Sequence, residues 1–231
     1  MSERLFVCDM DGTLIKEKVA NSNGEILPSR WDLIMDYLGD DACRREEEAK
    51  QEWYDGGYDT HPAKFLNDVI KIFRDEGLKE SYFEKVVGSY EYFPGVREVF
   101  SELHEYGYKT ALISGGFMAL AEMVSEDLGI DYTRAACKLE WNPQGNLAGW
   151  DLFREDYGSK IGSLKEIIVE CDADVSDCVY VGNGNNDVSV AKYVVDNGGI
   201  AIAFNGTPRL REVCTYSVND GNFCEVLEYI L

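Results

Sequence analysis

Short apolar runs alternate with longer segments of helical periodicity along most of the chain. Four runs are rich in β-branched residues and end at Gly, Asp, Asn or Ser: Leu5 to Cys8, Thr110 to Ile113, Cys178 to Val181 and Ile200 to Phe204. Such runs are typical of strands that are buried on both faces. Apolar residues at helical spacing lie between them, as at Val96, Val99, Phe100 and Leu103. This alternation predicts a doubly wound α/β fold, with a parallel sheet covered by helices on both faces.

The segment between the first two predicted strands is too long for a simple crossover. From about Lys16 to Val87 it offers only helical patterns, and a crossover helix needs far fewer residues. We therefore predict an inserted helical subdomain, residues 16–88, on a core formed by residues 1–15 and 89–231. Turn-forming sequences at Asn21 to Gly24 and Phe93 to Gly95 lie near the two expected hinges.

A second interruption of the pattern lies at Cys137 to Phe153, where apolar positions flank the turn-forming Asn142-Pro-Gln-Gly-Asn146. We predict a small β-hairpin flap there. Two tryptophans, Trp141 and Trp150, lie on its two strands. They are candidates for a ligand platform, although aromatic cross-strand pairs more often hold a hairpin together.

Composition and charge narrow the class of protein. The 231 residues are 45% hydrophobic and 28% charged, which is typical of a globular chain with a sizeable core. Lys and Arg number 22 against 43 Asp and Glu, so the net charge is −21. This charge disfavours nucleic acid and anionic membranes as partners. It also fits a salt-rich cytosol, although solubility alone accounts for it.

Cysteine usage and the apolar runs indicate the compartment. Seven cysteines, an odd number without a CxxC pair, argue against a disulfide framework and a zinc ribbon. The apolar run before Asp9 is too short for a signal peptide or a membrane span, and no later run is long enough. We expect a cytoplasmic protein with reduced thiols.

Candidate chemistry begins directly after the first predicted strand, at Asp9 and Asp11. Open α/β sheets bind ligands at this end of their strands. Two carboxylates this close repel each other unless a cation or a shared proton relieves them, so they indicate a hard cation such as Mg²⁺. The same spacing also occurs in ordinary turns.

Further candidates follow the later strands. Ser114-Gly-Gly116 precedes a predicted helix near Phe117, which suits a phosphate site or, alternatively, a simple helix cap. Gly182-Asn-Gly-Asn-Asn-Asp187 adds a carboxylate at the same edge, and Lys160 offers a fixed cation. Each feature alone has a structural explanation. Together, in this order at successive strand ends, they are the parts needed for metal-assisted phosphoryl transfer.

These motifs resemble the haloacid dehalogenase superfamily, in its phosphoserine phosphatase-like branch. The resemblance is carried by Asp9-Met-Asp-Gly-Thr13, Ile113-Ser-Gly-Gly-Phe117, Lys160, Gly182 to Asp187 and Ala201-Ile-Ala-Phe-Asn205. It implies a Rossmann-like core with a helical cap formed by the insertion. It also implies Mg²⁺-dependent hydrolysis of a small phosphorylated metabolite, phosphoserine or a related compound, through an aspartyl-phosphate.

The resemblance further implies a role for each matching residue. Asp9 would be the nucleophile, and Asp11 the general acid and then the general base. The phosphoryl oxygens would contact Ser114, the Gly115 amide, Lys160 and Asn186. The metal ligands would be Asp9, the Asp11 backbone carbonyl and residue 183, while Asp187 would hold the metal's water shell or Lys160.

The sequence departs from the family at the metal site and in the cap. Position 183 is Asn where the family usually has Asp, so metal affinity should suffer. The cap glutamate that binds the substrate amine falls at Lys18, with Glu17 as a substitute after a one-residue shift. No arginine for the substrate carboxylate lies in the predicted cap helix Ala63 to Phe73.

Three alternatives stay open at this point. The chain is a phosphatase for another small phosphate ester, a weakly catalytic or non-catalytic binding protein on a degenerate core, or a phospho-acceptor receiver domain. The second is motivated by Asn183. A receiver domain is about half this length and needs no cap. The sequence leaves the oligomeric state open.

Overall fold

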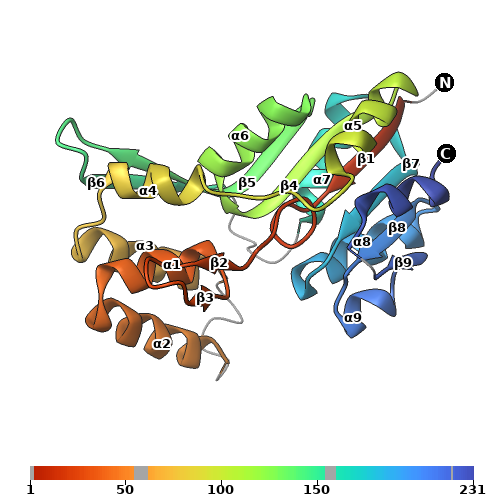
Figure 1. The fold of residues 1–231 in the computed structure, drawn as a ribbon. Helices are drawn as coiled ribbons and strands as arrows, with labels where there is room; N and C mark the ends of the chain where they lie inside the picture. Colours follow the sequence, from red (N-terminus) through yellow and green to blue (C-terminus); the bar gives the residue numbers. More distant parts are fainter. Residues whose placement is uncertain (1–2, 55–61, 154–159, 220) are drawn as a thin grey trace.

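A seven-stranded sheet forms the centre of the computed structural model, which describes residues 3–54, 62–153, 160–219 and 221–231 (Figure 1). The strand order is β6-β5-β4-β1-β7-β8-β9; β5 and β6 pair antiparallel and all other neighbours pair parallel. The strands are β1 (Glu3–Cys8), β4 (Lys109–Phe117), β5 (Tyr132–Trp141), β6 (Leu147–Leu152), β7 (Ala173–Gly182), β8 (Ile200–Phe204) and β9 (Tyr216–Val218).

Helices cover both faces of this sheet. Phe6 and Cys8 of β1 belong to one apolar cluster, with residues of α5 (Val96–Glu105) and α6 (Met118–Leu128). Leu5 and Val7 belong to the other, with α7 (Ile161–Glu170), α8 (Val188–Asp196) and α9 (Pro208–Arg211). Because successive side chains of a strand face opposite sides, burial on both faces requires the continuous apolar run seen in the sequence. The predicted doubly wound fold is confirmed.

The strand registers bring the carboxyl ends of β1, β4 and β7 together at one side of the sheet. Cys8 pairs with Leu112 of β4 and with Val181 of β7, so the residues that follow them lie at the same level. The Asp9 amide donates to the Val181 carbonyl at 2.9 Å, which holds the first loop against the third. Two parallel pairings elsewhere in the sheet had no clear sequence signal: the pairing of the first half of β5 with β4 and the pairing of the three-residue β9 with β8.

Between β1 and α5 the chain leaves the sheet and forms an insert beside its edge (Figure 1). The insert contains α1 (Arg30–Leu38), α2 (Asp40–Tyr54), α3 (Pro62–Asp75), α4 (Glu80–Val87) and an antiparallel pair, β2 (Val19–Ala20) with β3 (Ile26–Leu27). The prediction of helical structure alone was wrong at this pair. Asn21 accepts hydrogen bonds from the Asn23 and Glu25 amides and closes a hairpin turn, so the predicted hinge at 21–24 is a turn inside the insert. Strands of two residues are too short to show a periodicity.

The predicted hairpin flap is confirmed as β5 and β6, with Leu139 opposite Trp150. Its tryptophans contact the insert instead of forming a ligand platform. Trp150 Nε1 donates to Asn67 of α3 at 3.0 Å, and the Trp141 ring lies 5.4 Å from the ring of Phe83 in α4. The hairpin therefore connects the sheet edge to the helices of the insert.

The remaining short elements are the 3-10 helices η1 (Asn185–Asp187) and η2 (Phe223–Tyr229). All seven cysteines are free thiols. Within the described ranges, no helix is both long and apolar enough to cross a membrane.

Candidate active site

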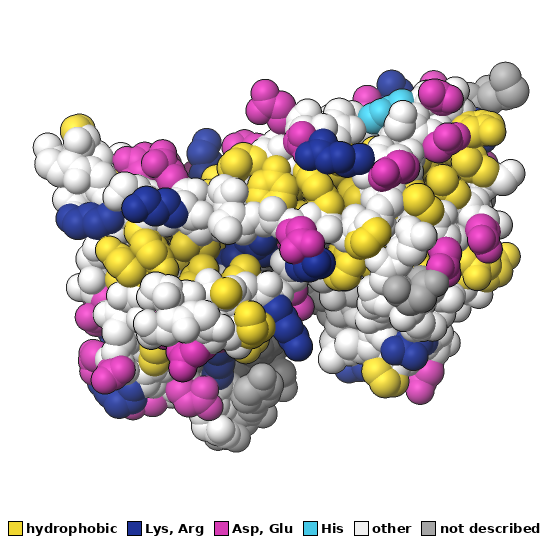
Figure 2. All heavy atoms as spheres, in the orientation of Figure 1, with side chains coloured by type: hydrophobic (Ala, Val, Ile, Leu, Met, Phe, Trp, Pro, Cys, Tyr) yellow, Lys and Arg dark blue, Asp and Glu magenta, His cyan; other side chains and the backbone are white. Residues whose placement is uncertain are grey.

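The loops after β1 and β7 and the carboxyl end of β4 enclose a cavity of about 260 Å³ where the insert meets the sheet. The space-filling view shows the insert and the sheet as two lobes with a hollow between them (Figure 2). Six of the predicted site residues line the cavity from the sheet side: Asp9, Asp11, Ser114, Gly115, Asn183 and Asn186. The opposite wall comes from the insert, with Glu17, Ser29, Arg30 and Trp31.

A buried cation lies between two carboxylates, of which Asp9 lines the cavity; the cation, Lys160, and Asp187 are not among the lining residues. Lys160 Nζ, at the start of α7, donates to Asp9 Oδ1 and, at 2.7 Å, to Asp187 Oδ1. The side chains are 7%, 5% and 0% exposed, respectively. Burial raises the pKa of Asp9 to about 7, against the lowering effect of Lys160. Burial opposes the charged form of Lys160 too, but Asp187 and Asp9 raise its pKa, so it stays a cation.

Both carboxylate oxygens of Asp187 accept hydrogen bonds from protein donors. Oδ1 also accepts from the Tyr180 hydroxyl at 2.7 Å, and Oδ2 accepts from the Asn183 and Gly184 amides, each at 2.9 Å. Burial opposes its charge, but Lys160 and these hydrogen bonds lower the pKa of Asp187. Asp187 is therefore placed to hold Lys160 and the loop after β7. Of the two roles that the resemblance implies for Asp187, holding the metal's water shell or holding Lys160, these contacts fit the second.

The loops after β1 and β7 touch at Gly12 and Asn183. Gly12 has a φ of +79°, and a Cβ built there would lie 1.9 Å from Asn183 Nδ2, so only glycine fits. The Thr13 hydroxyl lies 3.3 Å from Asp9 Oδ2 and 3.3 Å from Asn183 Oδ1. A carboxylate oxygen and an amide oxygen thus lie close together at the cavity wall.

This set of oxygen donors fits Mg²⁺. Magnesium is usually held by one or two carboxylates, with water and substrate phosphate completing its shell. Asp9, Asn183 and the backbone carbonyl of Asp11 are oxygen donors of this kind. Over the part of the chain that the structure describes, no three His, Cys, Asp or Glu side chains gather as a metal cluster, so a closed zinc-type site is not formed there.

The carboxyl end of β4 supplies the candidate phosphate site. The strand continues through Ser114, and α6 begins only at Met118, with Phe117 at its N-cap position. The helix-cap interpretation of Ser114 was therefore wrong. Its Oγ accepts from the Gly116 amide at 2.9 Å, which leaves the hydroxyl proton available for an anion in the cavity.

Arg30 is the main site residue that sequence reasoning missed. It is the first residue of α1, after the N-cap Ser29, and its side chain is 3% exposed. Arg30 Nη1 donates to Asp11 Oδ1 at 2.8 Å. Burial raises the pKa of Asp11, and Arg30 opposes this rise. The Ser29-x-x-Asp32 spacing marks the helix start in the sequence, but nothing there indicates where Arg30 points.

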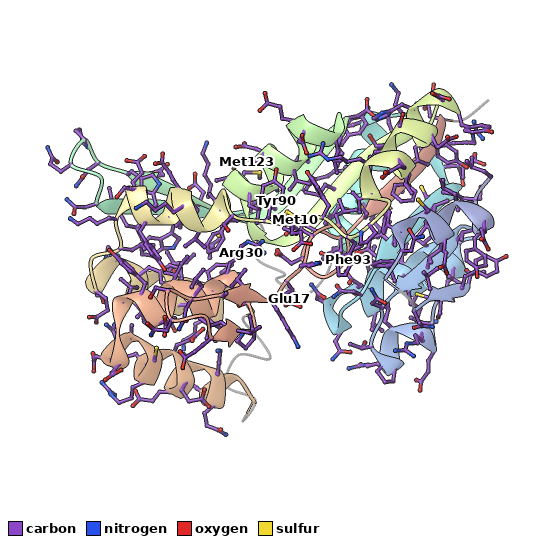
Figure 3. All side chains as sticks on the ribbon, viewed as in Figure 1. Met10, Glu17, Arg30, Tyr90, Phe93 and Met123 are labelled. Carbon is purple, nitrogen blue, oxygen red and sulfur yellow. The ribbon has the colours of Figure 1, made fainter. Side chains whose placement is uncertain are left out.

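Glu17 and Lys18, the two candidates for substrate binding, lie in different places. Glu17 lines the site cavity, whereas Lys18 lines a neighbouring cavity of about 270 Å³ together with Lys16 and Tyr90. Figure 3 shows Glu17 and Arg30 where the insert meets the sheet. The structure therefore does not bring Lys18 to the site, and a substrate-binding role for it is not supported.

Comparison with known proteins agrees with this geometry. The profile of the haloacid dehalogenase-like hydrolases matches residues 6–192. A phosphoserine phosphatase of Streptococcus thermophilus is 29% identical over 230 residues, which cover 98% of this chain and 95% of that protein. One of Methanocaldococcus jannaschii is 30% identical over 232 residues, covering 99% and 98%.

Solved structures give the same result. A phospho-aspartyl intermediate analogue of phosphoserine phosphatase has a TM-score of 0.76 at 25% identity, over 100% of both chains. The family's cofactor, Mg²⁺, is the cation that the donor set fits. The chain belongs to the haloacid dehalogenase-like hydrolases, in their phosphoserine phosphatase-like branch, and is a phosphatase.

Proposed function

We propose that this phosphatase hydrolyses phosphoserine, or a closely related small phosphate ester, through a phosphorylated Asp9. The contact that carries this proposal is the buried Asp9-Lys160-Asp187 arrangement, which lies beside Asn183 and Thr13 at one edge of the cavity. It supplies a nucleophile held next to a permanent positive charge, and phosphoryl transfer needs both.

Each step can be assigned to residues of the chain. An Asp9 oxygen attacks phosphorus, the ester P–O bond breaks, and Asp11 donates a proton to the leaving oxygen. The Ser114 hydroxyl, the Gly115 amide and Lys160 stabilise the equatorial oxygens. Asp11 then takes a proton from water, which attacks phosphorus, releases phosphate and restores Asp9. When bound at Asp9, Asn183 and the Asp11 carbonyl, Mg²⁺ supplies charge that offsets repulsion between carboxylate and phosphate.

We propose that the insert, residues 16–88, is the cap that binds the leaving group and thereby selects the substrate. Its contribution to the cavity wall, from Glu17 and from Ser29 to Trp31, supports this role. Glu17 is a carboxylate at the right place to bind a substrate ammonium group. The seven free thiols support a cytoplasmic location, where thiols stay reduced.

The alternatives make different predictions about turnover. A receiver domain does not agree with the family to which residues 6–192 belong. A binding protein on a degenerate core is excluded by robust phosphate release from any ester. The experiment is phosphate release from phosphoserine, phosphoethanolamine and p-nitrophenyl phosphate with Mg²⁺ and with EDTA.

Asp9→Asn is the decisive variant in this assay. We expect turnover by the wild type and a loss of at least about 10³-fold in the variant, because an amide is not a nucleophile. Asp196→Asn, which changes an exposed carboxylate of α8, is the matched control. Circular dichroism should show the same fold for all three proteins. Wild-type turnover by Asp9→Asn contradicts the mechanism, and binding without turnover by the wild type contradicts the enzyme.

A further inference from the structure

One guanidinium connects the candidate acid/base residue to both linkers between insert and sheet. Arg30 Nη1 donates to Asp11 Oδ1 at 2.8 Å and to the Lys16 carbonyl at 3.4 Å. Arg30 Nη2 donates to the Ser89 carbonyl at 3.2 Å. Lys16 lies on the linker that enters the insert, and Ser89 on the linker that leaves it. Arg30 itself is the first residue of α1 and therefore belongs to the insert.

This arrangement is poorly explained as a device for stability alone. The Arg30 side chain is 3% exposed, and its Nε is buried without a hydrogen-bond partner. Burying a charge with an unsatisfied donor costs free energy, and a buried ion pair is weak grounds for inferring a stabilising role. A role in catalysis therefore explains the contact with Asp11 better than a role in stability does.

The contact leaves the two Asp11 oxygens in different surroundings. Oδ1 is bonded to Arg30, which is the one side chain that bonds this carboxylate within the described residues. Oδ2 faces the phosphate site, since a Cβ built at Gly116 would lie 3.2 Å from it and 3.3 Å from Ser114 Oγ. A leaving oxygen on a phosphate bound by Ser114 would thus meet Oδ2.

From these contacts we infer that Arg30 is a positioning residue: it holds Asp11 Oδ2 toward the leaving oxygen when the insert is seated on the sheet. The inference rests on the proposed function, in which Asp11 protonates that oxygen. A shift of either linker would break the bonds to Lys16 and Ser89 and move Arg30 away from Asp11. Proton donation is thereby coupled to the position of the insert.

The test uses leaving groups that differ in their need for a proton. Phosphoserine and phosphoethanolamine are alkyl esters, whose leaving oxygen must receive a proton as the P–O bond breaks. In contrast, p-nitrophenyl phosphate releases p-nitrophenolate, which is stable as an anion. The measured quantity is kcat/KM, which reports on the step in which the leaving group departs. We expect Arg30→Met to lose roughly 100-fold on both alkyl esters and less than about fivefold on p-nitrophenyl phosphate.

Two further variants complete the test: a conservative substitution in case Arg30→Met folds poorly, and a control outside the cavity. Arg30→Lys retains one donor for Asp11 and should recover part of the loss on the alkyl esters, with the same difference between alkyl and aryl esters. Arg45→Met removes an arginine of α2 that pairs with Asp75 and Glu76, away from the cavity, and should change none of the three values. Thermal melts of all variants report on the fold.

The panel separates this role from the other roles open to Arg30. Equal losses on all three esters would mean a merely structural role and overturn the inference. A loss on phosphoserine alone would mean that Arg30 reads the substrate carboxylate, which phosphoethanolamine lacks, and would also overturn it. Absence of wild-type turnover on every ester would instead remove the proposed function on which the inference rests.

Discussion

Asn183 lines the cavity at the position where the resemblance leads us to expect an aspartate. Its amide oxygen lies 3.3 Å from the Thr13 hydroxyl, which also contacts Asp9. Its backbone is fixed by Asp187, and its side chain lies against Gly12, so a change from amide to carboxylate keeps the same shape. Because Lys160 already places a positive charge beside Asp9, the missing negative charge at 183 should weaken the attraction for Mg²⁺.

We therefore predict that Asn183→Asp lowers the Mg²⁺ concentration for half-maximal activity by roughly tenfold, or ~1.4 kcal/mol. The measurement is a metal titration of phosphate release. Asn197→Asp, at the exposed end of α8, is the matched control and should leave the titration unchanged. Asn183 precedes Gly184 and is prone to deamidation, so intact mass must be checked. The same Mg²⁺ dependence in both unmodified proteins would show that residue 183 is not a metal ligand.

At the scale of elements, the first linker explains why neighbouring residues serve different cavities. The Lys16 amide donates to the Glu91 carbonyl at 2.8 Å, which joins the two linkers. Lys16 and Lys18 line the second cavity, while Glu17 between them lines the site. Alternate side chains of an extended segment point in opposite directions, so a shift of one residue changes the cavity that a side chain enters.

The linker geometry predicts different effects of two adjacent substitutions. Glu17→Gln should raise the KM for phosphoserine by roughly tenfold, since it removes a partially solvated charge from the substrate ammonium. It should change the KM for phosphoglycolate, which has a carboxylate but no amine, by less than about twofold. Lys18→Gln is the matched control and should shift neither value. If Lys18→Gln alone changed the phosphoserine KM, the assignment of the two side chains would be reversed.

Across the whole chain, the balance of charge is strongly acidic, with a net charge of −21. The 43 acidic residues outnumber the 22 basic ones, so many acids have no cation to pair with. Figure 2 shows acidic side chains over both lobes on the visible face. The resulting repulsion opposes compactness, and salt screens charges on a surface much more than charges that are buried.

Thermal stability should therefore increase with salt. Between about 0.05 M and 1 M KCl we expect the midpoint of unfolding to rise by at least about 3 °C, or roughly 1 kcal/mol for a chain of this size. Circular dichroism in EDTA measures this without metal binding at the active site. Sucrose at matched osmolarity is the control for effects unrelated to charge. A constant or falling midpoint would show that charge repulsion does not limit stability.

Much of the fold could be read from local pattern because burial constrains each strand separately. The run Leu5 to Cys8 is apolar throughout because β1 is covered on both faces, and the position of Asp9 at its end follows. The motifs at the carboxyl ends of β1, β4 and β7 meet because parallel strands end at the same side of the sheet. Local pattern failed for β2 and β3, which are too short, and for Ser114, whose strand continues further than predicted.

Local pattern was enough to predict the parallel centre of the sheet, the order of the motifs and the chemistry of a phosphoryl-transfer site. Which side chains complete that site depends on contacts between elements far apart in the chain. Arg30 reaches Asp11 across 19 positions, and Lys160 reaches Asp9 across 151. Asp187 is filled by donors from Tyr180, Lys160 and its own loop. Such contacts depend on how separate elements pack in three dimensions, and no periodicity within one element records that packing.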